Sequence, residues 1–143
     1  MDVLFICIGN INRSQIAEAI FNRLSVSGHA KSAGLKPRRA GILLAKEHNN
    51  PVEVMKGEGY DLSKAKIKRV TRKMVEAADK TVLICRRENL AEAPDFLKGR
   101  PNVEFWDMWS ISDETAPVQY SALERKRIKL IEAHVRDLIK RSE

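Results

Sequence analysis

An apolar run over residues 3–8 is followed at once by a short loop and then by a helical pattern. The run is interrupted only by Cys7, which is typical of a strand buried on both faces of a parallel sheet. Apolar residues then recur at helical spacing, which predicts a helix from about Ser14 to Ser27 with Ser14 as its cap. A strand, a tight turn and a helix in this order favour an α/β fold.

The rest of the chain continues this alternation. Three further strands are predicted, over residues 29–34, 81–85 and 103–106. Helices are predicted over residues 51–59, 72–78, 88–97 and, with the clearest periodicity, 123–138. Strands that alternate with helices pair in parallel through right-handed crossovers, so we expect an open α/β sandwich.

The composition indicates one domain with a basic surface. With 143 residues, 43% of them hydrophobic, we expect a single domain over residues 1–143. No apolar run approaches the roughly 18 residues of a membrane span, so no membrane partner is expected. The net charge of +7 favours anionic partners such as phosphorylated substrates, but no nucleic-acid-binding motif accompanies it. Two widely separated cysteines, Cys7 and Cys85, indicate a reducing cytoplasm rather than a disulfide framework or a metal site.

The segment from Cys7 to Ser14 is where we expect chemistry. Its pattern is Cys-x5-Arg-Ser at the end of the first strand, and ligands of open α/β sheets bind at such ends. The intervening residues can turn their backbone N–H groups inward around an oxyanion, with Gly9 allowing the dihedral angles that this requires. The next helix adds the positive end of its dipole, and the Arg13 guanidinium can hold two oxygens of a tetrahedral oxyanion.

In this setting Cys7 is expected to be a thiolate at neutral pH and hence a nucleophile. The Ser14 hydroxyl can donate to that thiolate, and the Asn10 side chain can hold the backbone of the loop. Substrate binding is assigned to Ile8, Gly9, Asn10, Ile11, Asn12, Arg13 and Ser14. Taken singly, Cys7 could be an ordinary buried cysteine and Arg13 an exposed helix residue. Their order with the strand, the glycine loop and the helix favours a functional site.

These residues resemble those of the low-molecular-weight protein tyrosine phosphatases and of the thioredoxin-coupled arsenate reductases that share their fold. The similar segments are residues 3–7, 13–19, 32–34 and 59–63 and the closing amphipathic helix, which span nearly the whole chain. The resemblance implies a three-layer α/β sandwich with a four-stranded parallel sheet flanked by helices. It also implies a phosphocysteine intermediate on Cys7, with Arg13 clamping the phosphoryl group and with no metal or other cofactor.

The sequence departs from the family pattern in two places near the site. Asn12 stands where the family commonly has a second cysteine, so a protective disulfide within the loop cannot form. The family's general acid is an Asp shortly after the fourth strand, and counting from Trp106 that position falls on Ser110. Asp107 and Asp113 flank it, and we predict Asp113 as the acid, although either could equally be a loop carboxylate or a helix cap.

Three functions remain open. The leading hypothesis is hydrolysis of phosphomonoesters, either protein phosphotyrosine or small aryl phosphates, by Cys7, Arg13 and Asp113. The second is reduction of arsenate by Cys7 together with Cys85 or an external thiol reductant. Cys85 stands where such reductases have a second redox cysteine, but the third is missing and Cys85 also fits a buried strand. The third hypothesis is a phosphate- or phosphotyrosine-binding module without the general acid.

Basic residues follow the second predicted strand and could line one side of a cleft. They are Lys36, Arg38 and Arg39. They could set substrate specificity, or they could simply be solvated surface residues.

Overall fold

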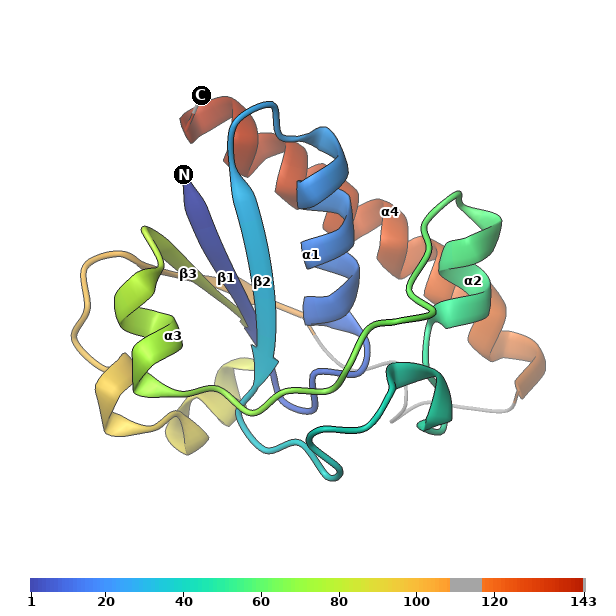
Figure 1. The fold of residues 1–143 in the computed structure, drawn as a ribbon, viewed down its shortest axis with the longest axis horizontal. Helices are drawn as coiled ribbons and strands as arrows, with labels where there is room; N and C mark the ends of the chain where they lie inside the picture. Colours follow the sequence, from blue (N-terminus) through green and yellow to red (C-terminus); the bar gives the residue numbers. More distant parts are fainter. Residues whose placement is uncertain (109–116, 143) are drawn as a thin grey trace.

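The computed structural model describes the backbone of residues 1–108 and 117–142, and side chains in the second range from residue 122. Four strands form one sheet: β1 (Asp2–Cys7), β2 (His29–Gly34), β3 (Lys80–Cys85) and β4 (Val103–Asp107). Their order is β2-β1-β3-β4, and neighbouring strands run parallel throughout (Figure 1). The predicted parallel four-stranded sheet is confirmed.

Helices cover both faces of this sheet. On one face lie α1 (Arg13–Leu24) and α4 (Pro117–Ser142), with α2 (Val52–Gly57) and the 3-10 helix η1 (Leu44–Lys46) beside them. On the other lie α3 (Arg72–Ala77) and the 3-10 helices η2 (Arg87–Glu92) and η3 (Asp95–Leu97). Phe5, Ile20 and Ile131 belong to the first core, and Leu4 and Val75 to the second. The three-layer sandwich is therefore confirmed, and alternate residues of β1 face opposite cores.

β1 lies inside the sheet, which determines where its last residue stands. Cys7 is in register with Gly34 of β2, and Ile6 is in register with Leu83 of β3. The segments that follow β1 and β3 pack on opposite faces of the sheet, so the carboxyl ends of these two strands flank a crevice. Cys7 therefore lies at the edge where open α/β sheets bind ligands.

Three helices differ from the prediction in extent. α4 is longer at both ends than the predicted helix over residues 123–138. α1 is shorter at its carboxyl end because Ser25 adopts an extended conformation. The prediction that Ser14 caps this helix is wrong, because Asn12 occupies the N-cap and the Ser14 hydroxyl is engaged elsewhere. The helix predicted over residues 88–97 is instead two 3-10 helices, since Ala93 precedes a proline and is extended.

The carboxyl end of α4 is bonded to the sheet through the Glu104 carboxylate of β4. This carboxylate accepts hydrogen bonds from Arg141 Nη2 at 2.9 Å, Trp106 Nε1 at 2.7 Å and Lys80 Nζ at 3.2 Å. Burial alone would raise the pKa of Glu104, but the hydrogen bonds from Arg141, Trp106 and Lys80 outweigh it and hold the pKa at about 2. The ionised form of Glu104 is therefore the one that stabilises the fold.

We predict that Glu104→Gln lowers the free energy of unfolding by about 2 kcal/mol at pH 7, because charge-assisted hydrogen bonds are lost. The native pKa lies below the ordinary value of 4.5, so the contribution is complete above that value and disappears as the pH falls towards 2. Urea unfolding at a series of pH values should show the two proteins converging below pH 4.5. The matched control is Glu88→Gln, which removes an exposed ion pair with Arg86 and should change stability little.

Candidate active site

The loop between β1 and α1 turns at Asn10, which has a left-handed backbone with φ of +54°. We expected Gly9 to provide the unusual dihedral angles, but Gly9 does not have a positive φ. A side-chain carbon added at Gly9 would meet only the Ile11 side chain at ordinary contact distance. Asparagine adopts the left-handed region more readily than most residues, so the turn is made one residue later than predicted.

The Asn10 side chain is fully buried and joins the loop to three neighbouring segments. Its Nδ2 donates to Ser14 Oγ at 2.8 Å and to Ser32 Oγ at 3.0 Å. Its Oδ1 accepts from the backbone N–H of Lys68 at 2.8 Å and from Gln15 Nε2 at 3.0 Å. The prediction that Asn10 holds the loop is consistent with these contacts, which fix it to α1, β2 and the segment before α3.

Asn10→Ala is predicted to lower the free energy of unfolding by about 3 kcal/mol and to reduce activity, since it removes buried hydrogen bonds and leaves alanine in a left-handed conformation. Asn10→Gly removes the same hydrogen bonds but tolerates the backbone, so it should be less destabilising by about 1 kcal/mol. Chemical unfolding of the three proteins separates the two contributions. Equal stability of the alanine and glycine variants would show that the left-handed backbone at residue 10 adds no cost for alanine, which would contradict the prediction.

Gly34, at the end of β2, allows the loop to pack against the sheet. The carbonyl oxygens of Cys7 and Ile8 accept hydrogen bonds from the backbone N–H groups of Leu35 at 2.9 Å and Lys36 at 2.8 Å. A side-chain carbon at Gly34 would lie 2.9 Å from both the Asn10 nitrogen and the Ile8 oxygen. No side chain fits there unless the loop moves, so Gly34 supports the site although it was not predicted to belong to it.

Several polar groups of the loop are available to a ligand. Within the described part of the chain, the backbone N–H groups of Gly9 and Ile11 donate to no protein atom. Cys7 Sγ lies 2.9 Å from Ser14 Oγ. Because Ser14 Oγ accepts from the Asn10 amide, its own hydrogen can point at the sulfur. Unpaired amides beside a sulfur with a hydroxyl donor suit an anion above a thiolate.

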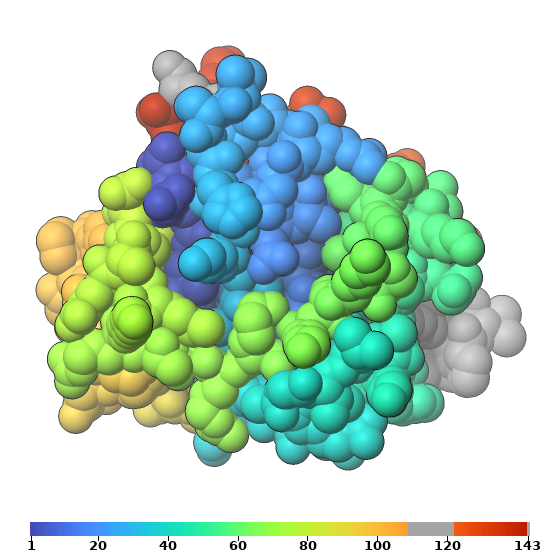
Figure 2. Space-filling model, in the orientation of Figure 1, coloured from blue at the N-terminus to red at the C-terminus, as the bar shows by residue number. Residues whose placement is uncertain are grey.

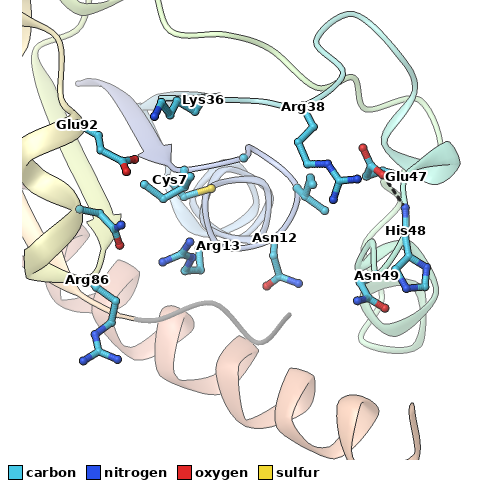
Figure 3. Close-up of a pocket in the computed structure, with 14 residues that line it drawn as sticks. Cys7, Asn12, Arg13, Lys36, Arg38, Glu47, His48, Asn49, Arg86 and Glu92 are labelled. Atoms are coloured by element: carbon cyan, nitrogen blue, oxygen red, sulfur yellow. Dashed lines mark hydrogen bonds between the residues drawn. The ribbon is translucent and has the colours of Figure 1, made fainter. Parts of the chain in front are cut away.

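Arg13 begins α1 and is almost completely buried, with 5% of its surface exposed. Its Nη1 donates to the Met108 carbonyl oxygen at 2.6 Å, which fixes the guanidinium against the segment after β4. Both Arg13 and Cys7 line one cavity of about 510 Å³. Figure 3 shows the sulfur and the guanidinium close together at the centre of this cavity.

The structure divides the predicted substrate-binding residues into two groups. Those that line the cavity are Ile8, Gly9, Ile11, Asn12 and Arg13. Asn10 and Ser14 have no exposed surface and do not line it. They lie behind the loop, where they hold it and contact the sulfur.

The outer wall of the cavity comes from loops that the sequence did not indicate. It includes residues 47–49 before α2 and Arg86, Asn89 and Glu92 after β3 (Figure 3). These residues come together only in the folded chain, and no sequence motif predicts that they do.

Of the three basic residues that follow β2, Lys36 and Arg38 line the cavity. Arg39 instead pairs with the buried Glu47 at 3.4 Å. Burial opposes the ionisation of Glu47, but hydrogen bonds from the His48 backbone and Arg39 lower its pKa. The ionised Glu47 therefore holds the loop of residues 47–49 as a wall of the cavity.

Of the residues considered for the general acid, the structure describes only Asp107. Asp113 and Ser110 lie outside the described residues. Asp107 is the exposed last residue of β4 and does not line the cavity.

Cys85 is fully buried at the end of β3, and burial raises its pKa to about 11. Because side chains alternate along a strand, Cys85 faces the core of Leu83, whereas Cys7 faces the core of Phe5. Both cysteines are free thiols. Alternation along the strands places their side chains on opposite faces of the sheet, but the charges of Arg13 and Cys7 still act on the pKa of Cys85.

Across the part of the chain that the structure describes, no three His, Cys, Asp or Glu side chains gather as a metal site. Within the same residues, no helix has the length and apolar character needed to cross a membrane.

A family model described as low molecular weight phosphotyrosine protein phosphatase matches residues 2–141. The chain belongs to this family. No curated protein matches its sequence significantly. Among solved structures, the low molecular weight protein tyrosine phosphatase of T. tengcongensis is 25% identical over 99% of both chains, with a TM-score of 0.73.

Other solved structures with a similar fold are named for different activities. An arsenate reductase from Archaeoglobus fulgidus is 23% identical, covering 96% of this chain and 98% of its own, with a TM-score of 0.71. A mutant of YwlE arginine phosphatase, a Bacillus subtilis protein, is 20% identical, covering 99% and 95%, with a TM-score of 0.78. The low molecular weight phosphatase fold is thus shared with proteins of several named activities, and the resemblance inferred from the sequence is confirmed.

Proposed function

We propose that this member of the low molecular weight phosphatase family hydrolyses phosphomonoesters, above all phosphotyrosine in proteins, through a covalent intermediate on Cys7. The observation that carries this proposal is one cavity lined by Cys7, Arg13 and the loop residues Gly9 and Ile11, whose backbone N–H groups donate to no described protein atom. A tetrahedral dianion satisfies all of these groups at once. Chemistry at phosphorus then needs a nucleophile in line with the leaving oxygen and a proton donor for that oxygen.

Two steps complete the proposed reaction. The Cys7 thiolate attacks phosphorus, so the S–P bond forms while the P–O ester bond breaks. The leaving oxygen takes a proton from a general acid, for which Asp113 remains our candidate and Asp107 the alternative. Water then gives its proton to the same carboxylate and attacks phosphorus, the S–P bond breaks and inorganic phosphate is released. Arg13 and the loop amides hold the equatorial oxygens throughout.

We also propose the substrate, the catalytic unit and the cellular location of this reaction. The reactant is a phosphorylated protein or a small aryl phosphate, and the acting unit is the single domain of residues 1–143. The free Cys7 and Cys85 thiols support a cytoplasmic location, where cysteines stay reduced.

Arsenate reduction is the second candidate, since arsenate has the shape of phosphate and Cys85 ends the strand next to β1. The opposite orientation of Cys7 and Cys85 and the raised pKa of Cys85 disfavour an internal thiol relay. An arsenate reductase built on this chain would therefore need an external thiol reductant. Thiol-dependent arsenite production that survives Cys85→Ala would identify that route.

Rapid mixing with an aryl phosphate tests the main proposal. We expect a burst of about one equivalent of aryl alcohol per protein if breakdown of the phosphocysteine is the slower step, together with a phosphorus signal attached to Cys7. Peptides bearing phosphotyrosine, phosphoserine or phosphoarginine then identify the preferred phosphoryl group. Tight phosphate binding without either turnover or a phosphoenzyme would instead support the non-catalytic binding module.

A further inference from the structure

The positive charge of the chain is concentrated in one segment. Residues 31–73 contain 12 Lys and Arg against four Asp and Glu, a net charge of +8. The remaining 100 residues contain 14 Lys and Arg against 15 Asp and Glu, a net charge of −1. The excess of +7 over the whole chain therefore arises entirely within residues 31–73.

The fold presents part of this segment as an extended edge. Gly34 forms a parallel bridge with Arg69, and Leu43 forms an antiparallel bridge with Lys66, so residues 65–70 lie beside the continuation of β2. Ile67 and Val70 are buried and anchor this edge. In Figure 2 the segment before α3 and the segment after β2 lie side by side on one face of the molecule.

Five exposed cations follow this edge to the mouth of the cavity, and we name them the basic strip. The basic strip consists of Lys64, Lys66, Arg69, Lys36 and Arg38. Lys36 and Arg38 also line the cavity that contains Cys7. Lys68 is not included, because its ammonium donates to the Lys66 carbonyl oxygen at 2.8 Å and burial lowers its pKa.

No cation of the strip forms an ion pair with a described acid, although Lys64 interacts electrostatically with Asp61 and Arg38 with Glu47. Of the 12 cations in residues 31–73, all of which the structure describes, Arg39 alone is ion-paired with a described acid. Elsewhere the chain does pair its surface cations with acids, as with Arg100, Arg136 and Arg141. Like charges side by side repel one another, so an anionic partner would relieve a cost that the folded chain retains.

The strip is also joined physically to the loop that holds Cys7. The backbone N–H of Lys68 donates to Asn10 Oδ1 at 2.8 Å, and the Lys66 carbonyl accepts from Gln15 Nε2 at 2.9 Å. A bound polypeptide that lies along residues 64–69 is therefore held at a fixed distance from the loop between β1 and α1. A ligand that occupies both places must be extended and acidic, with a phosphoryl group at one point.

We propose that the basic strip binds an acidic polypeptide segment next to the phosphorylated residue of a protein substrate, and so selects substrates with acidic flanking sequences. This inference rests on the proposed phosphatase function and specifies its substrate class. Nucleic acid is the less suitable occupant, because no Phe, Tyr or Trp side chain in the described part of the chain is more than partly exposed for bases to stack upon. The strip leads into a cavity for one phosphoryl group, which fits a single modified side chain in a polypeptide.

The test compares two phosphotyrosyl peptides that differ only in acidic flanks, Asp and Glu in one and Asn and Gln in the other. We expect wild-type kcat/KM to favour the acidic peptide by roughly tenfold at about 50 mM salt and to lose most of this preference at about 500 mM. The triple variant Lys64→Glu, Lys66→Glu, Arg69→Glu should abolish or reverse the preference. Its hydrolysis of a small aryl phosphate should stay unchanged, because these side chains do not line the cavity.

A matched triple variant controls for net charge. Lys126→Glu, Lys129→Glu and Lys140→Glu make the same change in charge at exposed positions of α4 and should keep the preference. Equal loss in both triple variants, or no preference in the wild type, would overturn the proposal. So would a strip variant that loses only binding to single-stranded nucleic acid or to phosphatidylserine vesicles while its peptide preference persists.

Failure of the phosphatase function itself would be seen separately, as absence of aryl phosphate hydrolysis by the wild type. In that case the strip is tested by binding alone, using fluorescence anisotropy of the two peptides on the Cys7→Ser protein. Tighter binding of the acidic peptide that disappears with the strip substitutions supports the docking surface. Equal binding of both peptides rejects it.

Discussion

Replacing Cys7 by serine is expected to lower kcat for aryl phosphate hydrolysis by roughly 10³-fold or more, the largest effect that we predict for one residue. A serine hydroxyl remains protonated at neutral pH and is a much weaker nucleophile than a thiolate. The change is nearly isosteric, and the Ser14 hydroxyl 2.9 Å from the sulfur can still form a hydrogen bond. The fold and the loop between β1 and α1 should therefore persist while chemistry is lost.

Binding and turnover must be measured together to interpret this variant. Phosphate should bind to Cys7→Ser about as tightly as to the wild type, while the burst of aryl alcohol disappears. Cys85→Ala is the matched control, since it removes the other buried thiol, whose side chain projects from the opposite face of the sheet. Retention of activity by Cys7→Ser, or an equal loss in Cys85→Ala, would contradict the proposed nucleophile.

β1 and β3 were predictable because they carry strong local signals, whereas the signal for β2, with the sequence His-Ala-Lys-Ser-Ala-Gly, is weak. β1 and β3 are short, nearly continuous apolar runs, which are typical of strands buried on both faces of a parallel sheet. The turn chemistry was less predictable. Ser14 has the residue type of a helix cap, but its hydroxyl instead contacts the Cys7 sulfur and the Asn10 amide. The positions of that sulfur and that amide are determined by the tertiary structure.

The centre of the candidate site could also be predicted, because Cys7 and Arg13 are adjacent to one loop and their spacing alone places them together. The supporting residues could not be found in this way. Gly34 is required by the approach of a loop 24 residues earlier in the sequence, and Glu47 holds a wall whose path depends on long-range pairing. Residues that act through contacts distant in the sequence leave no local pattern.

Arg13→Lys is the second large effect that we predict, a decrease of roughly 10²- to 10³-fold in kcat with a smaller change in KM. Lysine keeps the positive charge but cannot present two parallel N–H groups to a pair of phosphoryl oxygens. It would also lose the geometry that places Nη1 2.6 Å from the Met108 carbonyl oxygen, so the ammonium would not be held over the sulfur. Charge without this orientation binds the ground state but stabilises the transition state poorly.

Arg23→Lys provides the matched control for this substitution. Arg23 lies on the same helix, is exposed, and has its guanidinium 3.7 Å from the centre of the Tyr60 ring, away from the cavity. Steady-state kinetics should therefore show wild-type values of kcat and KM for this variant. If Arg13→Lys raised KM alone and left kcat intact, Arg13 would be a binding residue for the ground state only. The proposal that the planar guanidinium of Arg13 stabilises the transition state would then be wrong. A group that stabilises the transition state more than the ground state must change kcat when its orientation is lost.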